Sequence, residues 1–307
     1  MVRTFAAIDV GSFELEMGIY EISEKTGVRS IDHVKHMIAL GKDTFEDGKI
    51  SYQMVEETCR VLKDFASIMK GYQVNEYRAY ATTAMREAKN SQIVLEQIRV
   101  RTGIQVKVLS NSEQRFIRYK AIAIKASEFQ KTIQKGTAIA DVGFGSMQAS
   151  VFDKDSLIST QNLPLGVLKL RQILTHAKLS AQAEQSLVME LIDNELLTFR
   201  KMYLKDREIK HLIAIGDPIL TMYYKLNGIT RSDRLTAEKF NSFFEWMRTK
   251  TRAQLEDAFD VNGEYASMMF PTVAIYKRML EVTGAEILWV PGIRMADGTA
   301  AEYAEEK

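Results

Sequence analysis

The chain has 307 residues, of which 46% are apolar and 26% are charged, and its formal net charge is +1. This length predicts two domains, and the small net charge argues against nucleic acid or a membrane surface as a partner. Because Cys59 is the only cysteine and no 18-residue apolar stretch occurs, we expect a cytoplasmic protein without an intrachain disulfide or membrane span.

The first half of the sequence alternates strand and helix patterns. Short apolar runs at 5–10 and 15–22 flank Gly11-Ser12 and predict a β-hairpin, followed by a third strand over 30–40. The remaining patterns predict a helix over 51–72, a strand at 76–82, a loop and helix over 83–102, a strand at 104–110 and a helix over 112–129.

The second half repeats this order. A strand at 136–142 turns into a return strand at 148–153 and a third strand over 156–166. Further patterns predict helices over 180–205, 236–260 and 264–282 and strands at 211–217 and 285–292.

Both halves spell Asp-Val-Gly at the hairpin tip, and Asp9 and Asp141 are 132 positions apart. We infer an internal duplication that produces two α/β domains, 1–125 and 126–307. Two such domains would face each other across a cleft, with one hairpin tip on each wall.

Each tip has the composition of an anion site. A glycine lets backbone N–H groups approach a ligand, and a serine hydroxyl adds a donor. An aspartate beside them can hold Mg²⁺ or Ca²⁺ that bridges to phosphate, so Asp9 and Asp141 are the candidate metal ligands. For a single copy, a plain structural turn is the alternative. The candidate phosphate-binding residues of the two tips are Gly11, Ser12, Gly143, Gly145 and Ser146.

Two further segments follow predicted strands. In ATTAMREAKN, over 81–90, Thr83 and Arg86 suit a phosphate cradle, although a helix cap with a solvated arginine has the same spacing. In SNSEQRF, over 110–116, Glu113 lies near a helix start. It would orient or deprotonate a water there, or simply support the helix.

Assembled in order, these segments resemble the exopolyphosphatase/guanosine-pentaphosphate phosphatase (Ppx/GppA) family of the sugar kinase–Hsp70–actin superfamily. The similarity covers nearly the whole chain and matches the short, two-domain form of the family. It runs through AAIDVGS at 6, ATTAMREAKN at 81, VLSNSEQRF at 108, IADVGFGS at 139, LPLGVLKL at 163 and ADGTAAEY at 296.

The resemblance implies two actin-like (ribonuclease-H-like) domains around an active cleft. It also implies removal of the terminal phosphate of inorganic polyphosphate or guanosine pentaphosphate with Mg²⁺ as cofactor. Members of the family commonly dimerise, so a homodimer is expected, with no nucleic acid and no membrane as partner.

The chain departs from the family wording at both tips. The first tip usually reads Asp-x-Gly-Ser-Asn-Ser, whereas Phe13 and Glu14 occupy the last two places here. The second usually reads Asp-x-Gly-Gly-Gly-Ser-Thr-Glu, and Phe144 and Gln148 replace a glycine and the final acid. A later small-residue turn appears as AIGDPIL, over 214–220, where an aspartate and a proline would disturb anion binding.

The largest departure concerns the general base. The family reads Ser-Gly-x-Glu-Glu-Ala-Arg, where the second Glu is expected to activate water, and ungapped alignment places Gln114 there. A glutamine cannot accept the proton, and loss of a general base lowers a rate by about two to four orders of magnitude. Glu113 is the candidate substitute. Adjacent residues on a helix point about 100° apart, however, so its side chain would not point in the direction of the residue at 114.

Three hypotheses therefore stand at this point. The chain is a slow phosphoanhydride hydrolase, or a catalytically impaired relative that binds polyphosphate or guanosine penta/tetraphosphate as a sensor. In the third, its surface binds a partner protein.

Overall fold

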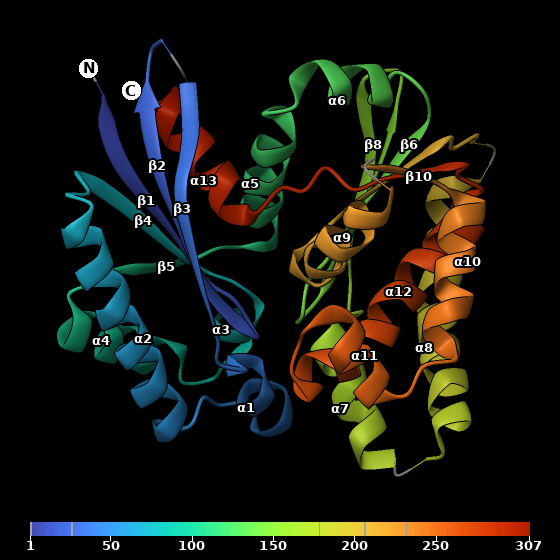
Figure 1. Ribbon diagram of the computed structural model, residues 1–307, viewed down its shortest axis with the longest axis horizontal. Helices are drawn as coiled ribbons and strands as arrows, with labels where there is room; N and C mark the ends of the chain where they lie inside the picture. Colours follow the sequence, from blue (N-terminus) through green and yellow to red (C-terminus); the bar gives the residue numbers. More distant parts are fainter. Residues whose placement is uncertain (1, 26, 178, 206, 231–232) are drawn as a thin grey trace. The chain divides into compact units, whose positions relative to one another are not determined.

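The computed structural model describes residues 2–25, 27–177, 179–205, 207–230 and 233–307 (Figure 1). The chain forms two compact units, Met1–Ile124 with Arg294–Lys307, and Lys125–Ile293. Each unit contains its own mixed β-sheet with helices packed on it.

The first unit is built on a sheet of order β3-β2-β1-β4-β5. Strands β1 to β3 are antiparallel neighbours, whereas β4 and β5 continue from β1 in parallel. Its elements are β1 (Arg3–Val10), β2 (Glu14–Ser23), β3 (Gly27–Met37), α1 (Leu40–Asp47), α2 (Tyr52–Gly71), β4 (Glu76–Ala81), α3 (Thr83–Glu87), α4 (Ser91–Thr102), β5 (Val106–Val108), α5 (Asn111–Ala123) and α13 (Met295–Glu305).

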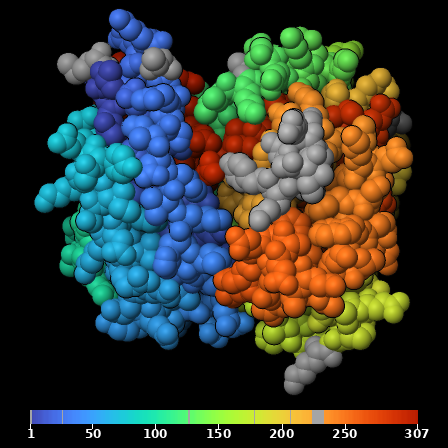
Figure 2. Space-filling view, viewed as in Figure 1, coloured from blue at the N-terminus to red at the C-terminus, as the bar shows by residue number. Residues whose placement is uncertain are grey.

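Side-chain alternation along β1 gives this sheet two buried faces. Ala6, Ile8 and Val10 belong to the core that includes residues of α2 and α4, and Phe5 and Ala7 belong to the core formed with α13. The edge strand β3 is largely exposed, and its blue side chains lie at the surface in Figure 2.

The second unit has a sheet of order β10-β11-β9-β6-β7-β8. Its elements are α6 (Ala126–Ile133), β6 (Thr137–Val142), β7 (Met147–Asp153), β8 (Ser156–Leu163), α7 (Val167–Ala177), α8 (Ala181–Phe199), a π-helical turn (Arg200–Leu204), β9 (His211–Ile215), α9 (Asp217–Thr230), β10 (Arg234–Thr236), α10 (Ala237–Arg248), α11 (Arg252–Phe259), α12 (Gly263–Thr283) and β11 (Ile287–Trp289).

The two units share one topology. The β6-β7-β8 meander lies beside parallel β9 just as the β1-β2-β3 meander lies beside parallel β4. The β2–β3 register shifts between Ile19 and Tyr20, and the β7–β8 register shifts between Val151 and Phe152, again 132 positions later. The repeat seen in the sequence is therefore a repeat of structure down to the position of a register shift.

The structure differs from the expected elements in several helices. The expected helix over 236–260 is divided into α10 and α11, because Thr251 starts a new helix with a capping box to Gln254. The expected helix over 112–129 is likewise divided into α5 and α6. The structure also contains α1, α7, α9 and α13, for which no helix was expected.

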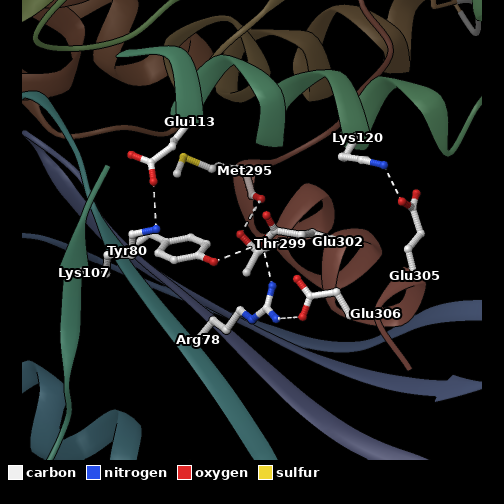
Figure 3. Close-up of polar contacts among 10 residues, drawn as sticks. All are labelled: Arg78, Tyr80, Lys107, Glu113, Lys120, Met295, Thr299, Glu302, Glu305 and Glu306. Carbon is white, nitrogen blue, oxygen red and sulfur yellow. Dashed lines mark hydrogen bonds and ion pairs between the residues drawn. The ribbon is translucent and has the colours of Figure 1, made fainter. Parts of the chain in front are cut away.

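The C-terminal segment corrects the expected division into 1–125 and 126–307, because α13 belongs to the first unit. Tyr303 stacks on Phe5 of β1, with ring centroids 4.2 Å apart. Arg78 of β4 forms an ion pair with Glu302 of α13 at 2.6 Å (Figure 3). Burial of this apolar helix face on a sheet more than 200 residues earlier is a non-local event that the local sequence pattern does not encode.

Candidate functional site

The first hairpin tip is a tight turn fixed by the chain that follows β3. The Gly11 N–H donates to the Glu14 carbonyl at 2.9 Å, and a Cβ at Gly11 would lie 2.7 Å from that oxygen, so only glycine fits. The Ile38 N–H donates to the Phe13 carbonyl at 2.9 Å, and the Gly41 N–H donates to the Ser12 carbonyl at 2.6 Å. The tip is therefore a rigid part of the first unit.

Side chains of this tip face inward. The Ser12 hydroxyl accepts a hydrogen bond from the Ala84 N–H at 3.2 Å and so ties the tip to α3. The Phe13 side chain is only 1% exposed. Phe13, which replaces an asparagine of the family wording, is thus a packing residue of the core.

The second tip repeats this geometry. The Gly143 N–H donates to the Ser146 carbonyl at 2.9 Å, and the Leu168 N–H at the start of α7 donates to the Phe144 carbonyl at 2.8 Å. Phe144 is 4% exposed and meets the Tyr265 ring edge-on at 6.0 Å. Gly145 is buried, whereas Gly143 and Ser146 are partly exposed.

A third turn approaches the end of β6. Gly216 has φ +122°, and a Cβ there would lie 2.1 Å from the Val142 carbonyl oxygen. Asp217 is the first residue of α9 and Pro218 the second, positions at which an acid and a proline suit a helix start. The turn thus has a glycine at its tight position, Gly216. Asp217 and Pro218, which we expected to disturb anion binding, form the start of α9.

Three of the predicted residues meet in the first unit. Arg86 Nη1 donates to the Leu109 carbonyl at 2.7 Å and to Gln114 Oε1 at 3.4 Å, and Nη2 donates to Thr83 Oγ1 at 3.1 Å. Burial lowers the pKa of Arg86, but a guanidinium remains charged in proteins. A positive charge thus lies directly beside the carboxamide that occupies the position of the expected base.

Glu113 has different surroundings from its neighbour. Its carboxylate accepts from the Ser110 N–H at 2.8 Å in a capping box and from Lys107 Nζ at 2.8 Å (Figure 3). The Lys107 ammonium and the Ser110 hydrogen bonds lower its pKa to about 2. Its side chain is 45% exposed, whereas Gln114 is 9% exposed. Glu113 supports the start of α5 and holds no proton at neutral pH.

The two aspartates occupy equivalent places. Asp9 and Asp141 lie one residue before the ends of β1 and β6, and both side chains are buried. Asp9 is paired in register with Glu16, and Asp141 with Gln148, both also buried. The equivalence of Glu16 and Gln148 leaves an acid across from Asp9 only.

Sequence analysis did not single out Glu16 as a site candidate. Its carboxylate lies 3.4 Å from His33 Nε2, and Glu14 on the same face forms an ion pair with Lys35 at 2.8 Å. Counting seven residues from each aspartate around the hairpin would have identified Glu16 as the counterpart of Gln148.

The similarity to known proteins agrees with this geometry. The model of the Ppx/GppA phosphatase family matches residues 19–290. The chain belongs to the Ppx/GppA phosphatase family. It is similar to exopolyphosphatase 1 of Mycobacterium tuberculosis, with 24% identity over 163 residues, 53% of this chain and 46% of that protein. It is also similar to the guanosine-5'-triphosphate,3'-diphosphate pyrophosphatase of Photobacterium profundum, with 25% identity over 159 residues, 50% of this chain and 31% of that protein. It thus spans less than half the length of these curated relatives.

Solved structures of the family confirm the expected fold of two actin-like α/β domains. The Aquifex aeolicus Ppx/GppA family member matches with a TM-score of 0.79 at 20% identity, covering 100% of this chain and 99% of that one. An exopolyphosphatase from Cytophaga hutchinsonii matches with a TM-score of 0.86 at 16% identity, covering 99% and 98%. In the described part of the Ppx/GppA chain, no helix is long and apolar enough to cross a membrane.

Each hairpin tip of this Ppx/GppA chain, taken by itself, has one carboxylate of the kind that a hard cation takes as a ligand. Mg²⁺ takes oxygen ligands and is typically bound by one or two carboxylates together with substrate phosphates. Asp9 and Asp141 each offer one such buried carboxylate at a strand end. Among the described residues, no three His, Cys, Asp or Glu side chains are grouped to hold a metal on their own.

Proposed function

We propose that the chain binds inorganic polyphosphate or guanosine penta/tetraphosphate and releases the terminal phosphate slowly, as a phosphohydrolase of the Ppx/GppA type. The observation that carries this proposal is the contact of the Arg86 guanidinium with Gln114 at 3.4 Å. This contact supports both parts of the proposal: Arg86 is the phosphate-binding group that is present, and Gln114 is the residue at the place of the general base that is lost. The names of the relatives, an exopolyphosphatase and a guanosine phosphate pyrophosphatase, support the substrate class.

Each unit has its own set of proposed binding groups. Arg86 and Thr83 supply charged and hydroxyl donors in the first unit, together with the backbone of Gly11 and Ser12. Gly143, Gly145 and Ser146 supply the equivalent turn in the second. Asp9 and Asp141 are the proposed Mg²⁺ ligands, and the ion when bound would neutralise charge on the phosphate oxygens.

Hydrolysis at this site lacks a proton acceptor on the protein. Water forms a new P–O bond while the bond from the terminal phosphorus to the bridging oxygen breaks, and the proton of the water passes to solvent. Gln114 orients that water through its carboxamide oxygen, but Glu113 is engaged by Ser110 and Lys107. The expected rate is about two to four orders of magnitude below that of a site with a glutamate base.

The same observations favour one second candidate, a relative that binds the phosphate compound without turning it over. A neutral Gln114 removes the like-charge repulsion that a glutamate base exerts on a phosphate anion. Occupation without turnover would suit a sensor of polyphosphate or guanosine phosphates.

Phosphate release with and without a restored base tests the proposal. The native chain, Gln114→Glu and the control Glu113→Gln would be offered tripolyphosphate, long-chain polyphosphate and guanosine pentaphosphate with Mg²⁺. We expect slow release by the native chain, at least about 100-fold faster release by Gln114→Glu, and no change in Glu113→Gln. No native release with rapid release by Gln114→Glu would favour the binding protein. Loss of native release in Glu113→Gln would contradict the proposal.

A homodimer, a cytoplasmic location and the absence of a nucleic-acid partner remain predictions of the sequence. Size-exclusion chromatography with light scattering measures the first of them.

A further inference from the structure

A basic cavity lies in the second unit, away from the proposed phosphate turns. It has a volume of about 770 Å³ and is bounded by the end of α8, the π-helical turn and the end of α12. Four cationic side chains line it together with Glu281: Arg200, Lys201, Lys205 and Arg207.

The cavity lies at the opposite end of the second sheet from the hairpin tip. Its lining residues Arg207 and Gly284 come just before His211 and Ile287, which begin β9 and β11. β9 is paired in parallel with β6, β11 is paired in parallel with β9, and β6 ends at the hairpin tip. The six residues of β6 span about 20 Å at about 3.3 Å per residue, so the cavity is separate from the turn at Gly143.

The charges of this cavity are only partly balanced. Within the described part of the chain, no ion pair joins Arg200, Lys201 or Lys205 to a carboxylate. Glu281 is already engaged by Lys277 at 2.6 Å and Arg278 at 2.6 Å. Arg207 has a distant partner, Asp153, at 3.9 Å.

Helix dipoles account for part of this positive charge. Cations are favoured at helix C-termini, and α8 with its π-helical turn and α12 both end here. Each end carries about −0.5 elementary charge, so the two together offset about one of the three unpaired cations. Among the residues that the structure describes, about two positive charges are left at the cavity, next to a π-helical turn, a local geometry that is frequent at functional sites.

We propose that this cavity is a second anion site for a compact polyphosphate, either free or carried on a nucleotide. One guanidinium and two ammonium groups match a ligand with several adjacent negative phosphates better than a monoanion. The site goes beyond the proposed function, because it uses none of the residues of the hairpin turns.

Calorimetric titration with tripolyphosphate tests the site in the full chain. We expect two binding events in the native chain, and the double variant Lys201→Glu/Lys205→Glu should lose one by at least tenfold weaker binding. Phosphate release at the hairpin turns should be unchanged in this variant. The control Lys210→Glu removes a cation that pairs with Glu208 at 3.2 Å outside the cavity lining, and it should keep both events.

The outcomes separate this site from the proposed function. Arg86→Ala should remove only the other event, and unchanged binding in Arg86→Ala would contradict the proposed function alone. Equal binding in the double variant and Lys210→Glu, whether both are native-like or both are weakened, would overturn the cavity site. Repeating the titration with ATP identifies the source: equal affinity for ATP and tripolyphosphate supports recognition of free phosphates, and tighter ATP binding supports a nucleotide.

Discussion

Replacing Tyr20 by phenylalanine measures how firmly α13 is held on the first unit. Tyr20 lies in β2, is 2% exposed, and its hydroxyl donates to Asp297 Oδ1 at 2.7 Å. Burial and the neighbouring Asp297 carboxylate raise the pKa of Tyr20, so the hydroxyl keeps its proton. The other oxygen, Asp297 Oδ2, accepts from the Arg294 N–H at 2.7 Å. Because the acceptor that loses its donor is a carboxylate and the ring packing is kept, we expect the free energy of unfolding to fall by about 1.5–3 kcal/mol.

The control variant removes a hydrogen bond of the same kind, from a tyrosine hydroxyl to an aspartate, at the surface. The Tyr72 hydroxyl donates to Asp32 Oδ2, also at 2.7 Å, but Tyr72 is 40% exposed. Water replaces that bond, so Tyr72→Phe should change stability by no more than about 0.5 kcal/mol.

Hydrogen exchange of β1 and β2 amides in urea reports the first unit. Fluorescence of Trp246 and Trp289, which both belong to the second unit, monitors the remainder of the chain. Equal losses of stability in Tyr20→Phe and Tyr72→Phe would refute the argument from burial.

Three other substitutions test the turns and the helix start. Gly216→Ala should destabilise the second unit by more than about 2 kcal/mol in urea denaturation, because φ is +122° and the Cβ would lie 2.1 Å from a carbonyl oxygen. Phe13→Ala should lower the free energy of unfolding by about 3–5 kcal/mol, since its ring is buried; weaker tripolyphosphate binding at unchanged stability would contradict a packing role. Glu113→Gln keeps a capping side chain but removes the charge. The folded-state pKa is about 2, below its ordinary value of 4.5, so the charge stabilises above pH 4.5 and the benefit disappears as pH falls toward 2. The stability difference between native and variant, measured by denaturation from pH 7 to pH 2, should therefore shrink to zero; a difference independent of pH would disprove it.

Local pattern predicted much of the sheet structure. Apolar runs separated by glycine turns are short-range signals, and they placed β1 with β2 and β6 with β7 correctly. The repeated Asp-Val-Gly motif predicted the duplicated topology, and the order of the motifs indicated the family that the comparisons show.

The resemblance to the family pointed to Arg86, Thr83 and Gln114 as site candidates, but their contact could not be seen in the sequence. They come from α3 and α5, and the Leu109 carbonyl that holds Arg86 comes from the residue after β5. The departures from family wording were visible, whereas the burial of Phe13 and Phe144 depends on the cores into which each tip is folded.

The sequence by itself indicated most of the strands and both hairpin tips, because each depends on residues that are neighbours in the chain, and its resemblance to the family marked position 114 as a glutamine where a glutamate is expected. Only the tertiary structure decided that α13 returns to the first unit, that Glu16 lies opposite Asp9, and that residues 200–205 meet the end of α12 around a cavity. The physical reason is that burial and charge pairing act between segments far apart in the chain, and their partners are chosen only when the whole core is assembled.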